Sequence, residues 1–202
     1  MTNTASTQTG NFWDFAAPQP TQDADLLKQL NFLPGFKELL MVRQVHALEH
    51  ATVWVLDQRQ ATSPSDNNSL GGLSTDEGFY LYGQVNTTDL KRAVPTALSR
   101  LKTGEWDLAV HPRCGTNLSV GMFLTAGLAI GAHLLLPRSP LEQMLGIGIA
   151  AATATQLTPD LGTLAQRHLT TSIPFNLAIT DISATSDLWG RAAHFVQVRW
   201  QD

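Results

Sequence analysis

The 202-residue chain has a single cysteine, Cys114, and no run of lysine or arginine residues. One cysteine excludes a disulfide within the chain, and it suits a reducing compartment or a role as metal ligand or nucleophile. Seventeen acidic and 13 basic residues give a net charge of -4. Without a basic patch, nucleic acid is a poor candidate partner. The chain also lacks the basic start and apolar run of a secretory signal, so we expect its soluble part in the cytoplasm.

The composition favours one domain with an appendage. Since 43% of the residues are apolar, a chain of this length can bury one good core. Residues 1–24 are rich in Thr, Gln and Pro and show no hydrophobic period, so we expect a disordered tail there and a single domain over residues 25–202. A long loop is expected from Arg59 to Asp76, where Ser, Asn and Gly are frequent.

Two histidines and a glutamate stand at helical spacing in the sequence HALEH at positions 46–50. The surrounding apolar period, uninterrupted by Gly or Pro, predicts a helix from Phe36 to Gln58. Residues three and four apart lie on one face of a helix, so His46, Glu49 and His50 should point the same way. Two imidazoles one turn apart can share one metal ion.

A second group of candidate ligands stands in the sequence HPRCGT at positions 111–116. His111 offers an imidazole and Cys114 a thiolate, on a turn bounded by Pro and Gly where side chains can be aimed at a fixed point. We predict that a short strand from Trp106 to Val110 leads into this turn. Both groups are expected to converge on one ion, with zinc as the expected cofactor.

Three versions of this site remain open from the residues alone. In an open version, His46, His50 and Cys114 bind zinc, which lowers the pKa of its bound water to about 7, and Glu49 takes the proton. In a closed version His111 is a fourth ligand, the metal is structural, and Glu49 orients a histidine. In the third version there is no metal, and Cys114 is a reactive thiol beside an imidazole and a helix N-terminus.

Two apolar stretches follow the turn, from Leu118 to Leu136 and from Met144 to Leu157. The first has 19 residues without a formal charge, and as a helix it would extend roughly 28 Å, enough to cross a bilayer core. Its small residues favour close helix contact in lipid. We expect an antiparallel membrane hairpin inserted at about 118–157, with the lipid bilayer as partner. The alternative is a buried hairpin in a soluble fold.

The rest of the domain predicts a small sheet. Alternating patterns indicate strands from Gly78 to Val85, from Ile173 to Ile182 and from Ala193 to Trp200. With Trp106 to Val110 they give about four strands, and a helix after Thr87 or Thr88 makes a β-α-β unit. The expected fold class is α+β, with a roughly four-stranded sheet, helices on one face and the inserted hairpin.

With both motifs in view, the chain resembles an uncharacterised family of small membrane-associated proteins known mainly from cyanobacteria. The likeness extends from about Gly35 to the C-terminus. The motif pair is also similar to that of a second uncharacterised family of bacterial membrane proteins. Separately, the HxxEH spacing is similar to the inverted zinc-protease motif, in which two His bind zinc and the Glu is the general base. That family takes another ligand from a later helix, and here Cys114 or His111 would have to replace it.

These observations lead to two hypotheses for function. The first is a membrane-associated zinc protein that hydrolyses peptide or amide bonds near the bilayer surface, with Glu49 as its catalytic residue. The second is a non-catalytic assembly or scaffold factor of a photosynthetic membrane, with a membrane-protein partner. In both, the chain is expected in an inner or thylakoid membrane with its soluble part on the cytoplasmic side.

Overall fold

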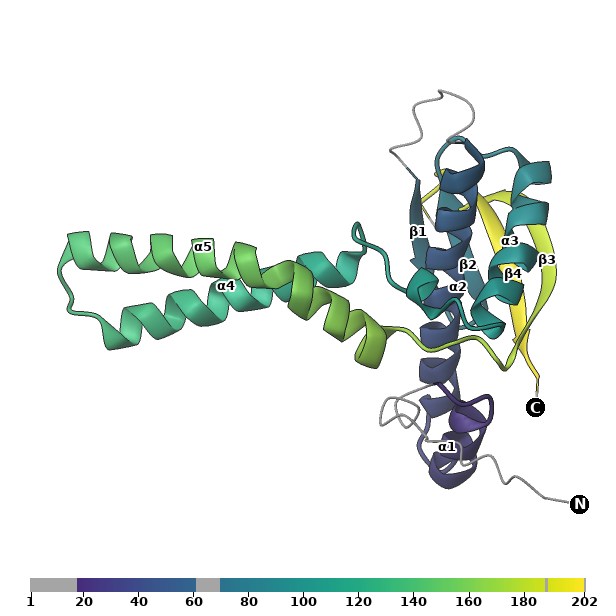
Figure 1. Cartoon of the computed structure of the whole chain (residues 1–202), viewed down its shortest axis with the longest axis horizontal. Helices are drawn as coiled ribbons and strands as arrows, with labels where there is room; N and C mark the ends of the chain where they lie inside the picture. The colour runs from purple at the N-terminus through teal and green to yellow at the C-terminus, as the bar shows by residue number, and fades with distance from the viewer. Residues whose placement is uncertain (1–17, 61–69, 188, 202) are drawn as a thin grey trace, which may run out of the picture.

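The computed structural model describes residues 18–60, 70–187 and 189–201. It has a body, in which helices cover one face of a four-stranded sheet, and a helical hairpin that projects far from this body (Figure 1). The α+β fold class with an inserted apolar hairpin is therefore confirmed.

Three helices belong to the body: α1 (Gln22–Leu30), α2 (Phe36–Gln60) and α3 (Thr87–Lys102). Helix α2 confirms the predicted long helix, and it contributes much of the core, including Val45, Leu48 and Leu56. Residues 22–24 belong to α1, although we had expected them in the tail, because the buried Asp23 accepts hydrogen bonds from Gln44 and Ser172. Residues 1–17 of that tail lie outside the described residues.

The sheet is antiparallel throughout, with the strand order β1-β2-β4-β3. Its strands are β1 (Gly71–Ser74), β2 (Gly78–Tyr82), β3 (Leu177–Ser186) and β4 (Ala192–Trp200). The strand predicted at 193–200 is present as β4, and the one predicted at 78–85 is present as β2 but ends at Tyr82. The strand predicted at 173–182 begins and ends four residues later, as β3. Strand β1 lies inside the segment that we predicted as loop, and it forms the edge of the sheet beside β2.

The predicted strand from Trp106 to Val110 is wrong, and so is the β-α-β unit. Trp106–Ala109 forms the 3₁₀ helix η2, with main-chain bonds from Leu108 N to Glu105 O and from Val110 N to Asp107 O. The segment contacts α2 instead of pairing in the sheet. It still leads directly to His111, so the error in secondary structure leaves the order of the site residues unchanged.

The hairpin consists of α4 (Gly115–Leu135) and α5 (Pro140–Ala165), followed by a π-helical turn, η3 (Gln166–Thr170). Small residues of α5 face α4 at intervals of four or eight, and they are the buried residues of that helix: Gly146, Ala150, Ala154 and Gly162. Such residues allow two helix backbones to approach closely. Both arms are longer than predicted, and α5 continues through Pro159 to Ala165.

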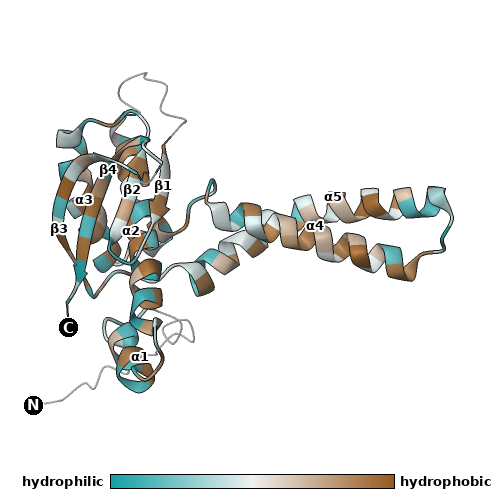
Figure 2. Cartoon of the chain, turned by 180° about the vertical axis from the view of Figure 1, so that it is seen from behind, coloured by the Kyte–Doolittle hydropathy of each residue, from teal (hydrophilic) through white to brown (hydrophobic). Residues whose placement is uncertain are grey.

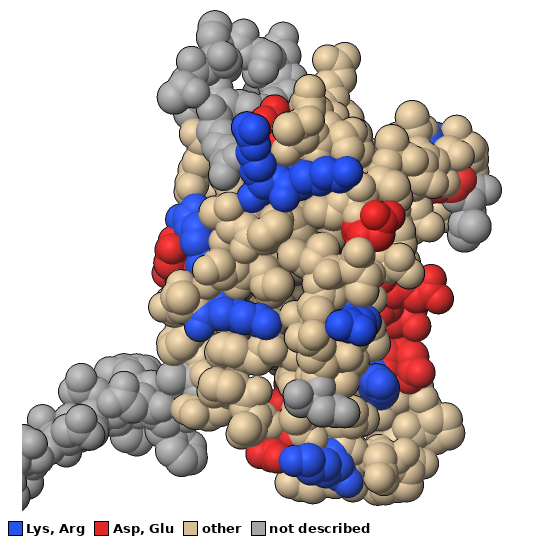
Figure 3. All heavy atoms as spheres, turned by 90° about the vertical axis from the view of Figure 1, so that its right-hand side faces the viewer, with Lys and Arg blue, Asp and Glu red and all other residues tan. Residues whose placement is uncertain are grey.

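The outer surface of the hairpin is apolar. Helix α4 has no buried residue, and Phe123 and Leu135 are 79% and 86% exposed. In Figure 2 apolar brown segments recur along both arms, between near-neutral and polar ones. By contrast, the face of the body that points away from the hairpin carries dispersed acidic and basic residues (Figure 3). Within the described residues, α4 is the one helix long and apolar enough to cross a membrane, with a mean hydropathy of 1.8.

Candidate metal site

Helix α2 forms the floor of the candidate site. His46 and His50 lie one turn apart with their ring centroids 4.3 Å from each other, as the spacing predicts. Glu49 lies between them in the chain and lines the same pocket. Because His46, Glu49 and His50 all belong to one helix of 25 residues, their relative positions depend on helix geometry and not on a loop.

Both histidines are oriented by main-chain carbonyl groups. His46 Nδ1 lies 3.0 Å from Thr170 O, and His50 Nδ1 lies 2.7 Å from Ala109 O. A carbonyl oxygen can only accept a hydrogen bond, so each Nδ1 carries a proton, and a neutral ring held in this way has its lone pair on Nε2. Histidines that bind metal ions are usually held in this way, with one ring nitrogen donating to a carbonyl and the other free for the ion.

Cys114 meets these imidazoles from the start of the hairpin. It is the N-cap of α4, and its Sγ accepts a bond from Thr116 N at 3.3 Å. The same Sγ lies 3.3 Å from His46 Nε2. Burial acts to raise the pKa of the Cys114 thiol, but nearby His50 and the Thr116 bonds outweigh it and lower the pKa. The lowered pKa increases the fraction of thiolate, the form that binds metals.

The three ligand atoms fit one small ion. Those of His46, His50 and Cys114 all lie within 4.8 Å of one another. Zinc bonds of about 2.0 to 2.3 Å in tetrahedral geometry place ligand atoms about 3.3 to 3.8 Å apart. The Cys114–His46 distance of 3.3 Å already lies in this range, and a pair at the 4.8 Å limit would need to close by about 1 to 1.5 Å.

His111 lines the pocket but stands outside this group of three. Its ring lies 5.8 Å from the His50 ring and 5.0 Å from the Trp54 ring, measured between centroids, and its Nδ1 accepts a bond from Arg113 N. Burial, followed by the nearby His50 and Arg113, lowers the pKa of His111 to about 4. His111 is therefore neutral at pH 7, and its role as a fourth ligand stays a prediction.

Glu49 is buried beneath strand β1. Ser74 Oγ donates to Glu49 Oε2 at 2.6 Å, and a Cβ atom at Gly72 would overlap the Glu49 carboxylate. Burial raises the pKa of Glu49, against the lowering effects of the Ser74 bond and of His46. The edge strand thus fixes the carboxylate next to the histidine pair.

The candidate ligands, Glu49 and strand β1 line a pocket of about 380 Å³. Its floor is α2, one side is β1 with Leu70, and the other side is the turn from His111 to Thr116. Val42 and Val53 add apolar surface. The pocket has room for a small molecule or a side chain beside Glu49 and the three candidate ligand atoms.

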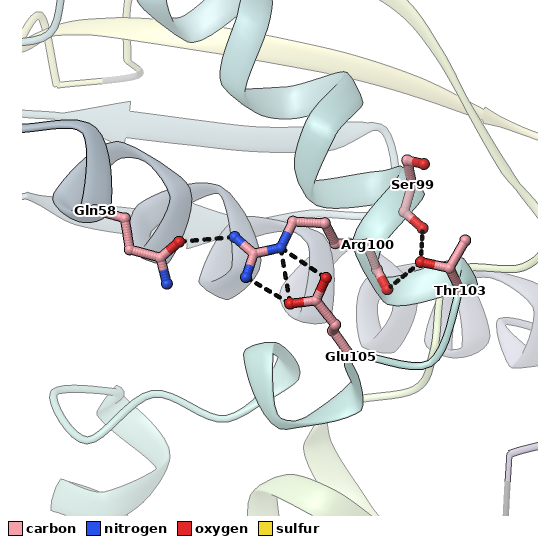
Figure 4. A network of polar contacts seen from close by, with 5 residues as sticks. All are labelled: Gln58, Ser99, Arg100, Thr103 and Glu105. Atoms are coloured by element: carbon pink, nitrogen blue, oxygen red, sulfur yellow. Dashed lines mark hydrogen bonds and ion pairs between the residues drawn. The ribbon is translucent and has the colours of Figure 1, made fainter.

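An ion pair at the far end of α2 holds η2 in place (Figure 4). Arg100 of α3 bonds Glu105 through Nε at 3.0 and 2.9 Å, and its Nη1 donates to Gln58 at 2.8 Å. Trp54 Nε1 also donates to Val110 O at 2.9 Å. These contacts fix the main chain whose Ala109 carbonyl accepts from His50.

Sequence reasoning missed the residues that orient the ligands. Ser74 and Gly72 lay in the predicted loop, and the carbonyl groups of Ala109 and Thr170 carry no sequence signal. Gln166 was also missed, because nothing in the local sequence distinguishes a buried glutamine from an exposed one. Its side chain is fully buried and bonds the main chain of the candidate site.

Comparison with known proteins identifies the family of this chain but gives no activity for it. The chain is 55% identical over 197 residues to an uncharacterized protein of Picosynechococcus sp., covering 95% of this chain and 96% of that protein. No solved structure matches the chain. The family described as Domain of unknown function (DUF6391) matches residues 41–182, which contain most of α2 with His46 and His50, the turn at 111–116 and the whole hairpin. The expected resemblance to an uncharacterised cyanobacterial family is thus confirmed, and the chain belongs to the DUF6391 family.

Proposed function

We propose that this chain is a zinc-binding membrane protein with an open coordination position that serves hydrolysis of peptide or amide bonds. The observation that carries the proposal is the pair of Nδ1-to-carbonyl contacts at His46 and His50. They direct two Nε2 lone pairs toward the thiol of Cys114. Two imidazoles and a thiolate are a ligand set that zinc prefers, and three protein ligands leave a fourth position for water or substrate.

Glu49 supports the hydrolytic role. A bound zinc ion supplies Lewis acidity and lowers the pKa of water to about 7. Glu49 lines the pocket next to His46, and its buried carboxylate has a raised pKa. A carboxylate of this kind is suited to take a proton from the attacking water and to return it to the leaving amine.

The edge strand β1 supports a polypeptide substrate. Thr75 N donates to Gly78 O, which identifies a hydrogen-bonded pair, and such pairs alternate along an antiparallel ladder. By this alternation the main-chain groups of Gly71 and Leu73 bond to β2. Those of Gly72 and Ser74, two residues that line the pocket, point outward from the edge of the sheet. An extended peptide that pairs with these groups would lie beside His46, His50 and Cys114, which we call the ligand triad.

The hairpin supports a membrane location. The 21 residues of α4 extend about 31 Å, close to the roughly 30 Å of a bilayer core. In the core helix of a soluble protein most of the apolar segment would be buried, whereas none of the apolar segment of α4 is buried. Cys114 begins this helix, so the candidate site would lie at the bilayer surface. We further propose an inner or thylakoid membrane and a cytoplasmic body.

A scaffold role is the second candidate, and the same ligands favour it. His46 and His50 belong to α2, whereas Cys114 begins the hairpin. An ion bound there would cross-link the body to the hairpin, in the way that structural zinc ions join separate segments of a chain. In this version the chain assembles with a membrane-protein partner, for which the cyanobacterial relative suggests a photosynthetic membrane.

Glu49→Gln in the zinc-loaded full chain separates the two candidates. The probe is a library of fluorescence-quenched peptides presented to protein in lipid nanodiscs, with zinc per chain measured on the same samples. If Glu49 takes the proton, turnover should fall by about 10²-fold or more while zinc content stays constant, since Glu49 lies outside the triad. Absence of turnover in the wild type, or full turnover in Glu49→Gln, would favour the scaffold.

A further inference from the structure

Gln166 joins the second arm of the hairpin to the turn that carries Cys114. Its side chain is fully buried at the start of η3. Gln166 Oε1 accepts from His111 N at 2.8 Å, and Gln166 Nε2 donates to His111 O at 3.1 Å. One side chain therefore binds both main-chain groups of the residue that opens the turn. Hydrogen bonds of this kind are costly to break in a buried site, because their partners are left without water.

Asn117 completes the contact from the first arm. Its Oδ1 accepts from Gln166 Nε2 at 2.8 Å, and its Nδ2 donates to Pro112 O at 2.8 Å. The two amides, one from each arm, thus bind consecutive residues of the turn. We call Asn117 and Gln166 the amide clamp. It can form only where the two arms are in close contact.

Gly162 makes that close contact possible. A Cβ atom at Gly162 would overlap Asn117 Oδ1 and approach Asn117 Cγ to 2.9 Å. The arms also meet beside the candidate site, where Thr116 Oγ1 lies 3.2 Å from Thr170 Oγ1. Thr170 O is the acceptor that orients His46. Both ends of the hairpin therefore contact groups that position the ligand triad.

We propose that Gln166 is a positioning residue, and that the amide clamp couples packing of the two hairpin arms to metal binding. The inference rests on the proposed zinc site. When the arms pack, the clamp holds the turn so that Cys114 faces His46 and His50. When they separate, the turn loses both bonds from Gln166, Asn117 loses its bond from Gln166, and the thiol is no longer held at the ligand position. By linkage, zinc in turn stabilises the packed arms.

Two variants test the coupling in the full chain in lipid nanodiscs. Gln166→Met keeps the length of the side chain and removes its hydrogen bonds. Gly162→Ala forces Asn117 from its position, and Gly148→Ala is the matched control, since a Cβ at Gly148 meets nothing within 4 Å. Zinc affinity is measured by competition with a chromogenic chelator, and Co²⁺ spectra report thiolate coordination.

We expect Gln166→Met and Gly162→Ala to weaken zinc binding by about 5- to 150-fold, the range of typical coupling energies, and to reduce the thiolate-to-Co²⁺ absorption. Gly148→Ala should bind as the wild type does. Wild-type affinity in Gln166→Met, or equal affinity in the two glycine variants, would overturn the coupling while leaving the zinc site intact. Absence of zinc binding in the wild type would instead remove the proposed function itself.

Discussion

Replacing Gly72 with alanine tests the contact between the edge strand and Glu49. In the structure an added Cβ would overlap Oε1 and Cδ of Glu49, so the carboxylate has to move. Its hydrogen bond from Ser74, now 2.6 Å long, would be lost. Gly71→Ala is the matched control, because a Cβ there meets nothing within 4 Å.

The expected loss follows from the burial of Glu49. Hydrogen bonds to charged groups contribute about 1.5 to 3 kcal/mol, and a buried group left unsatisfied costs a similar amount. Alanine in place of glycine also reduces the freedom of the unfolded chain, which stabilises by about 0.4 to 1 kcal/mol. This second effect is common to both variants and cancels in their comparison. Gly72→Ala should therefore be about 1 to 3 kcal/mol less stable than Gly71→Ala.

Urea unfolding of both variants, reconstituted identically, measures the difference. Zinc content should be the same in both, because Glu49 lies outside the ligand triad. If peptide turnover is found in the wild type, Gly72→Ala should lose it by about 10²-fold and Gly71→Ala should retain it. Equal stability of the two variants would refute the argument that β1 holds Glu49 by close approach at Gly72.

Three further predictions concern other parts of the molecule. Burial acts to raise the pKa of Asp187, but bonds from Arg191, Tyr82 and Trp189 N lower it to about 2. Asp187→Asn should therefore be less stable than the wild type in thermal unfolding at pH 7. The difference should shrink below about pH 4, the pKa of an unfolded Asp, and disappear as the pH falls through about 2. His111→Ala should keep its bound zinc, since His111 lies outside the triad, and loss of zinc would indicate the closed four-ligand site. After alkaline washing the full chain should stay in the membrane pellet because of its exposed α4, and recovery in the soluble fraction would count against the membrane hairpin.

The parts of the fold that were predictable are those with a strong local period. Helix α2 follows from apolar spacing over many turns without Gly or Pro, and α4 from a long uncharged stretch. Strand β1 could not be predicted, because the sequence GGLS has low strand propensity and pairs only through its contact with β2. The five residues from Trp106 to Val110 were too few for alternation to exclude a 3₁₀ helix, and the contact with α2 decided their conformation.

The meeting of His46, His50 and Cys114 was predictable from the sequence, but their orientation was not. Spacing alone indicated that His46, Glu49 and His50 share a face, and the structure brings the first and last of these to Cys114. The groups that orient them come from distant segments, such as Thr170 O for His46. Such contacts depend on tertiary packing between the hairpin and the body, for which a single sequence has no local pattern.

The zinc content of the full chain, prepared without an affinity tag and equilibrated with zinc, tests the central proposal most directly. Elemental analysis should give about one zinc per chain in the wild type, and less in His50→Ala and Cys114→Ala, because each removes one of three ligands. His133→Ala is the control, since this histidine bonds Gln143 between the outer ends of the hairpin arms, and it should keep its zinc. A wild type without zinc, or unchanged zinc in both triad variants, would contradict the proposed metal site.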